Sequence, residues 1–167
     1  MKFIRCTFLL MAMSLLVLGC VFDMYNLTPP IPQDIENSKT FSSSFDKVWT
    51  ATVQTFAELN LDIATIEKDS GIIVSNYFLI SNEERYIHKA KNEYCDCGTA
   101  ELLTEHYRKV KFNVFLKELA GESIEVRVNA VFENRTSRPT GGLDSVNSCV
   151  STGKFESEIF KLIGDRI

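Results

Sequence analysis

Three cysteines are the residues of this chain whose type and spacing could do chemistry. Cys95 and Cys97 are separated by a single residue, and Cys149 stands well downstream of them. Two such thiols can form a disulfide bond, three thiols with a histidine can hold a metal ion, and a close pair can take part in redox exchange. The other two cysteines of the chain, Cys6 and Cys20, lie near its start.

The first residues have the composition of a secretory signal peptide. Lys2 and Arg5 are basic, and residues 8–18 form an apolar run that a single serine interrupts. The alternatives are a plain secreted protein and an uncleaved transmembrane anchor, for which the uncharged stretch 6–22 is at the short limit.

The leader ends in Val17-Leu18-Gly19-Cys20, which resembles the bacterial lipobox. The resemblance implies cleavage between Gly19 and Cys20 and a covalent lipid on Cys20, and we expect no other cofactor. Two or more acyl chains anchor a protein firmly to a membrane without a spanning helix. An aspartate after the lipidated cysteine favours retention in the inner membrane, and Val21 stands there instead. The resemblance therefore implies an outer-membrane anchor, with the domain expected in the periplasm.

Export of this kind favours a disulfide among the remaining cysteines. We expect one loop cysteine to pair with Cys149, and we favour Cys97 over Cys95 because Gly98 relieves crowding beside it. One alternative is a zinc site that adds His88 to the three thiols, although Cys-x-Cys is tighter than the usual ligand spacing. A redox role of the Cys-x-Cys pair is another alternative, and it requires a lowered thiol pKa.

Composition and motifs narrow the classes of function. The formal net charge is −4, which gives no support for nucleic-acid binding, a role that needs a clustered basic face. The sequence has no His-Glu-x-x-His, Gly-x-Ser-x-Gly or phosphate-loop pattern. We therefore expect a protein that is not an enzyme.

Beyond the signal peptide, 1–19, we expect a tether over 20–39 and one globular domain over 40–167. Prolines crowd residues 29–32, and they favour an extended spacer over helix or sheet. The expected elements of the domain are a short strand near Thr40, a helix over 45–60, strands over 61–66 and 72–80, a hairpin of strands over about 109–117 and 124–133, and a last helix from about Thr152.

The hairpin has the clearest pattern, because apolar and polar residues alternate along both of its strands. This period of two predicts one wet and one buried face. The element order predicts an α+β fold, an antiparallel sheet of about four to five strands with two helices packed on one face. We expect the polar segments 81–98 and 134–148 to be loops.

Two short motifs carry a second resemblance. Phe-Asp-Lys-Val-Trp at 45–49 and Lys-Asp-Ser-Gly-Ile-Ile at 68–73 resemble small domains of bacterial envelope lipoproteins related to BamC, a component of the outer-membrane β-barrel assembly machine. The resemblance implies a helix-grip-like fold and a protein-binding accessory role, while the cysteine loop departs from it. We therefore expect a non-catalytic, membrane-anchored envelope lipoprotein with an envelope protein as partner. The alternative is a binder of a small ligand or metal around the three cysteines.

Overall fold

The computed structural model describes residues 29–80, 94–98, 105–137 and 145–167. Gly19, Cys20 and His88 lie outside the described residues. The lipid anchor and the contribution of a histidine to a metal site therefore stay predictions.

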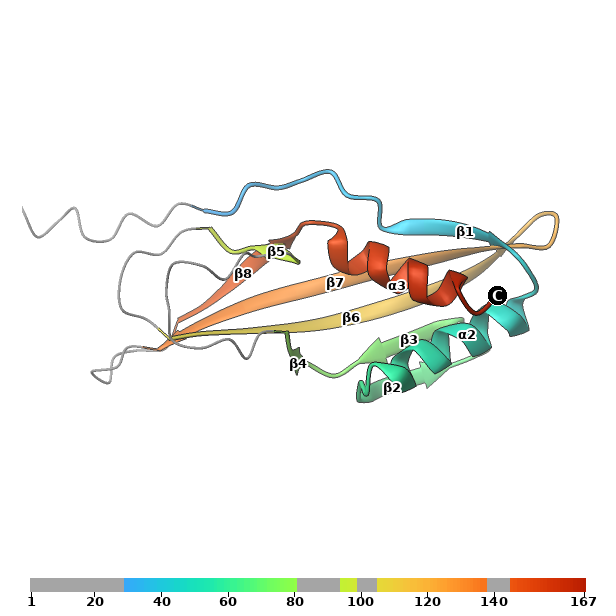
Figure 1. The fold of residues 1–167 in the computed structure, drawn as a ribbon, viewed down its shortest axis with the longest axis horizontal. Helices are drawn as coiled ribbons and strands as arrows, with labels where there is room; N and C mark the ends of the chain where they lie inside the picture. The colour runs from blue at the N-terminus through green and yellow to red at the C-terminus, as the bar shows by residue number, and fades with distance from the viewer. Residues whose placement is uncertain (1–28, 81–93, 99–104, 138–144) are drawn as a thin grey trace, which may run out of the picture.

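A long antiparallel hairpin runs the length of the domain (Figure 1). Its strands are β6 (Glu105–Leu119) and β7 (Ser123–Ser137), joined by a tight turn in which Gly121 has a φ of +77°. The register places Phe112 opposite Ala130, so apolar side chains of the two strands share one face. This confirms the predicted alternation, and the buried apolar side chains of the pair are Val110, Phe112, Val114, Leu116, Ile124, Val126, Val128 and Phe132.

Short strands extend the sheet beyond β6. The strand β3 (Ile72–Ser75) pairs with β6, and β2 (Ile63–Glu67) pairs with β3 and forms the edge of the sheet. A two-residue strand, β4 (Phe78–Leu79), pairs with β6 farther from the turn. Between β2 and β3, Gly71 has a φ of +67°, and its carbonyl accepts a hydrogen bond from the Leu116 amide at 2.8 Å.

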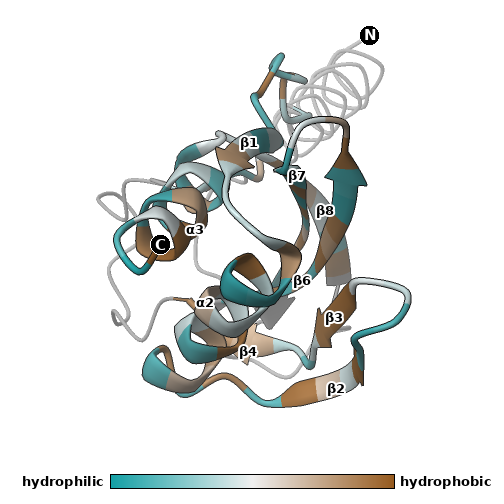
Figure 2. Cartoon of the chain, turned by 90° about the vertical axis from the view of Figure 1, so that its right-hand side faces the viewer, coloured by the Kyte–Doolittle hydropathy of each residue, from teal (hydrophilic) through white to brown (hydrophobic). Residues whose placement is uncertain are grey.

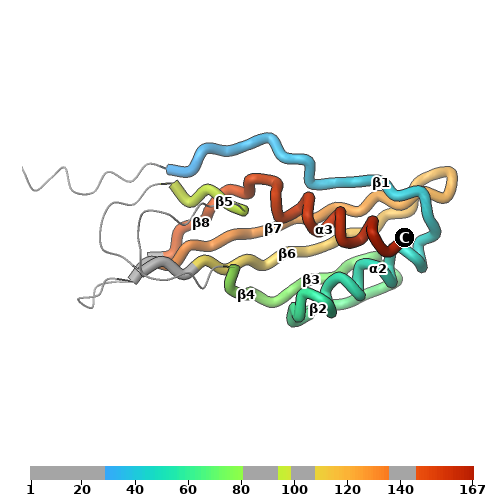
Figure 3. Tube along the Cα trace, viewed as in Figure 1, coloured from blue at the N-terminus to red at the C-terminus, as the bar shows by residue number. Residues whose placement is uncertain are grey.

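The other side of the hairpin carries two strands at different heights. The strand β1 (Ser38–Ser42) pairs with the part of β7 near the turn, and β8 (Ser145–Ser151) pairs with the opposite end. Figure 3 shows these two strands beside different halves of β7. The two-residue strand β5 (Cys95–Asp96) then pairs with β8 at that far end.

Two helices cover one face of this curved sheet (Figure 2). They are α2 (Phe45–Glu58) and α3 (Lys154–Gly164), and an ion pair between Glu58 and Arg166 links their C-terminal ends. Each helix has an apolar stripe that packs on the sheet, because burying such a stripe is the main source of helix stability in a domain.

Aromatic rings fill the space between the helices and the sheet. The Phe155 ring of α3 lies 5.0 Å from the Phe112 ring and 5.9 Å from the Phe132 ring, both edge-on. The Phe56 ring of α2 lies 4.8 Å from the Phe112 ring. Phe112 is therefore the point where both helices and the hairpin meet.

The α+β class and the two helices on one face are confirmed, but the predicted strand count is wrong. Within the described residues the sheet has eight strands instead of four to five. Part of the difference is that the segment predicted as one strand over 72–80 is divided between β3 and β4. The pairing of β3 with β6 ends at Val74, while the Asn76 amide still bonds to the Asp62 carbonyl at 2.8 Å. Tyr77 then donates a hydrogen bond to Glu133 on β7.

The segments predicted as loops also contain strands. Residues 95–96 form β5, β7 continues to Ser137, and Ser145–Ser151 forms β8. The sequence of β8 shows no apolar alternation that would predict a strand. It places polar or weakly apolar side chains on the helix side and exposes Val146 on the other side. Its position is set by backbone pairing with β7, which side-chain periodicity does not report.

Candidate functional site

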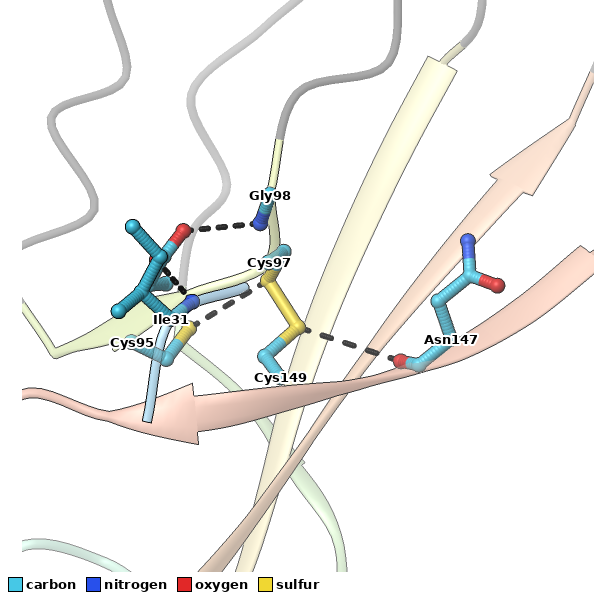
Figure 4. The surroundings of a disulfide bond; sticks show 7 residues. Ile31, Cys95, Cys97, Gly98, Asn147 and Cys149 are labelled. Atoms are coloured by element: carbon cyan, nitrogen blue, oxygen red, sulfur yellow. Dashed lines mark hydrogen bonds between the residues drawn. A yellow bond between two sulfur atoms is a disulfide. The ribbon is translucent and has the colours of Figure 1, made fainter. Parts of the chain in front are cut away.

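The pairing of β5 with β8 brings the three cysteines together. Cys95 lies opposite Ser151 and Asp96 opposite Val150, so the next residue, Cys97, faces Cys149. The Cα atoms of Cys97 and Cys149 are 4.2 Å apart, and their sulfurs form a disulfide bond (Figure 4). This is the pairing that the sequence favoured.

Cys95 supplies a third sulfur beside this disulfide. Its Sγ lies 3.7 Å from the Sγ of Cys97, and the three sulfurs all lie within 4.8 Å of one another. The Cys95 side chain is 1% exposed, whereas Cys97 and Cys149 are half-buried. Cys95 is the free cysteine of the described residues.

Burial sets the protonation state of this free thiol. It raises the pKa of Cys95 to about 11, while the Arg108 guanidinium opposes the increase and the Asp96 carboxylate adds to it. The thiol is therefore neutral at pH 7, which makes it a poor nucleophile in the disulfide-bonded state. This counts against the redox reading of the Cys-x-Cys pair, because that role needs a lowered pKa.

Asp96 holds the corner on which both loop cysteines sit. One carboxylate oxygen accepts a hydrogen bond from the Gly98 amide at 2.8 Å, and the other accepts one from the Ile31 amide at 3.1 Å. Gly98 has a φ of +73°, a conformation that favours glycine over other residues. The same carboxylate thus turns the chain after Cys97 and ties the expected tether to the site.

The start of α3 packs beside the cysteines through a buried polar pair. The Ser151 hydroxyl donates to the Glu156 carboxylate at 2.7 Å, and Glu156 is 1% exposed. Burial raises the pKa of Glu156, while the hydrogen bond from Ser151 and one from the backbone partly offset this. Tyr94 connects β5 to the same helix, because its hydroxyl donates to Glu158 at 2.9 Å.

The sequence interpretation missed Arg108, although a signal for it existed. Extending the alternation of β6 backwards from Val110 places Arg108 on the helix-side face of the sheet, where an arginine is unexpected. Its Nε is buried and has no hydrogen-bond partner among the described residues. Arg108 therefore brings a positive charge to the cysteine end of the sheet.

A second candidate surface lies at the opposite edge of the sheet. All five residues of β2 are exposed, and among the described strands β2 pairs with β3 alone. Its large apolar side chains Ile63 and Ile66 are 37% and 49% exposed. An open, apolar edge strand offers unpaired backbone groups to another chain.

Comparison with known proteins leaves this chain without a family assignment. No protein-family model matches it, and no curated protein sequence matches it. Of the two described helices, neither has the length and apolar character needed to cross a bilayer.

Proposed function

We propose that this chain is a lipid-anchored envelope protein whose α+β domain binds an extended segment of another envelope protein along the β2 edge, and that it catalyses no reaction. The resemblance of Val17-Leu18-Gly19-Cys20 to a lipobox supports the anchor. The resemblance of 45–49 and 68–73 to BamC-related domains supports a protein-binding role.

The observation that carries the binding part is the exposure of every residue in β2. Monomeric proteins usually protect such an edge with charges, prolines or a covering loop. Here Ile63 and Ile66 remain in contact with water, and the one charged residue of the strand, Glu67, is its last. Addition of a partner strand satisfies the open backbone groups and covers these isoleucines.

Site-specific photo-crosslinking in intact cells tests the edge. A photoreactive residue at Ile66 should give an adduct with one envelope protein, identified by mass spectrometry. The matched control is Val131, which is 50% exposed on the wet face of β7, away from the edge. Ile63→Lys should reduce the Ile66 adduct at least severalfold. Equal adducts from both positions, or none from Ile66, would contradict the proposal.

The anchor has its own test. Cys20→Ser should release the domain into the soluble periplasmic fraction or leave the leader uncleaved, because no lipid can be attached. Mass spectrometry of the native protein should find acyl chains on Cys20. The anchor is overturned if Cys20 is unmodified in the native protein. It is also overturned if the variant keeps its mature size and its membrane retention. Neither outcome would affect the β2 result.

One observation favours the alternative function, a metal-binding lipoprotein, and it is the convergence of three cysteine sulfurs. A small ligand between helices and sheet has less support, because Phe56, Phe112 and Phe155 fill that space.

A further inference from the structure

The spacing of the cysteine sulfurs matches that of metal-bound thiolates. Zinc–sulfur bonds of about 2.3 Å in a tetrahedral site place neighbouring sulfurs about 3.8 Å apart. The Sγ atoms of Cys95 and Cys97 are 3.7 Å apart, and Cys149 lies within the same 4.8 Å group. Opening the disulfide would let the sulfurs of Cys97 and Cys149 move apart towards the same spacing.

A crosslink between β5 and β8 needs two cysteines, and this site has three. Cys95 occupies a strand position facing the core, with 1% exposure, where an aliphatic side chain would pack as well. Its sulfur nevertheless sits against the disulfide, so the crosslink does not account for it. A bound metal ion would account for the position of this sulfur, because coordination removes the thiol proton that burial otherwise retains.

The surroundings suit an anionic cluster with a cation at its centre. Three thiolates around a monovalent or divalent ion leave a net negative charge, and Arg108 brings a fixed positive charge whose Nε has no hydrogen-bond partner among the described residues. The Asp96 hydrogen bonds to Gly98 and Ile31 do not involve the cysteine sulfurs, so they can hold the loop when the disulfide opens.

We propose that reduction of the Cys97–Cys149 disulfide converts Cys95, Cys97 and Cys149 into a three-thiolate site for one thiophilic cation of the Cu(I) or Zn²⁺ class. Soft thiolate ligands select these ions over hard cations. The site is independent of the β2 edge, and its failure would leave the protein-binding proposal unchanged.

The conversion balances with a dithiol as the reductant. The dithiol gives two electrons and two protons, its sulfurs form an intramolecular disulfide, and Cys97 and Cys149 become thiols. A cation supplied in its bound oxidation state then displaces the three thiol protons to solvent as three metal–sulfur bonds form. The oxidised protein lacks two of these ligands and should not bind.

Anaerobic titration of the detergent-purified full chain with Cu(I) and, separately, with Zn²⁺ tests the site. The dithiol-reduced chain should take up one ion in native mass spectrometry and show a thiolate-to-metal charge-transfer band. The oxidised chain should show neither. Cys95→Ser leaves both cysteines of the disulfide in place, and after reduction it should bind at least about tenfold more weakly, because a ligand is lost.

Ser148→Ala is the matched control, since Ser148 is exposed on β8 next to Cys149 and its loss should not change affinity. Circular dichroism before and after reduction follows the fold. The proposal is overturned if the reduced chain binds neither ion. It is also overturned if Cys95→Ser binds as tightly as the parent, or if the reduced chain is unfolded and stays so when the ion is added.

Discussion

The end of the β6–β7 hairpin near its turn and the end away from it are stabilised in different ways. Near the turn, the hairpin buries apolar side chains such as Leu116, Ile124 and Val126 under the helices. At the far end, β5 and β8 place Cys95, Cys149 and other polar or weakly apolar residues on the helix side. A disulfide between Cys97 and Cys149 joins these two strands.

The difference shows two ways to hold a strand in a sheet. Burial is non-directional and adds up over many side chains, so near the turn many residues share the stabilisation. The strand β5 has two residues, too few for backbone pairing to hold alone. There the crosslink to Cys149 and the polar contacts of Asp96 add to the packing of Cys95 in the core.

The largest effect should come from removing the ring at the junction of both helices and the hairpin. Phe112→Ala should lower the free energy of unfolding by about 3–5 kcal/mol, because it leaves a cavity between Phe56 and Phe155. Urea denaturation measures it. Val131→Ala, on the wet face of β7, should cost less than about 1 kcal/mol. Equal losses of unfolding free energy in the two variants would mean that the buried side chains of the hairpin do not dominate its stability.

Breaking the crosslink should have the next largest effect and should act on the far end. Cys149→Ser opens a closure that spans 52 residues and should cost about 2–4 kcal/mol. Hydrogen exchange should then speed up in β8 more than in β1. Cys95→Ser, which keeps the disulfide, is the control and should leave the β8 amides better protected. Uniform loss of protection in both strands would contradict a division between the ends.

A pair of glycines sharpens the description of the turn end. A Cβ at Gly71 would meet the Leu116 carbonyl oxygen at 2.3 Å, whereas one at Gly121 would meet nothing within 4 Å. Both have positive φ, so Gly121→Ala isolates the backbone cost, about 1 kcal/mol. We expect Gly71→Ala to cost about 2–3 kcal/mol, because β3 must also move away from β6. Urea denaturation measures both variants. The same shift of the denaturation midpoint for both would contradict close packing at Gly71.

The smallest effect should come from the buried carboxyl beside the cysteine end. Because the pKa of Glu156 is raised by folding, its contribution to stability is present below the ordinary glutamate pKa and is lost as the pH rises through the folded value. Glu156→Gln removes this loss, so the variant should gain stability relative to the parent as the pH rises towards 7. Ser151→Ala should lose more stability than the parent as the pH rises, because it lacks the hydrogen bond to the charged form of Glu156. The free energy of unfolding, measured by urea denaturation at several pH values, tests this. The same pH dependence for parent and Glu156→Gln would refute it.

The two ends also differ in how far sequence could predict them. Alternation in 109–117 and 124–133 predicted the hairpin and its buried face, because burial leaves a periodic trace. The strand β8 leaves none, since Cys149 and Ser151 face the helices and Val146 faces water. The expected export predicted a disulfide to Cys149, and Gly98 beside Cys97 favoured that partner, but the closeness of Cys95 depends on the register of β5 with β8. Arg108 could have been found by continuing the period of β6.

The hydrogen bond from the Ile31 amide to Asp96 has a consequence for orientation. It fixes the N-terminal segment at the cysteine end, from which the chain runs along the domain to β1 (Figure 1). A lipid on Cys20, eleven residues earlier in the sequence, would then turn the cysteine end towards the bilayer and the hairpin turn away from it. The anchoring surface and the tip of the hairpin would lie at opposite poles of the molecule.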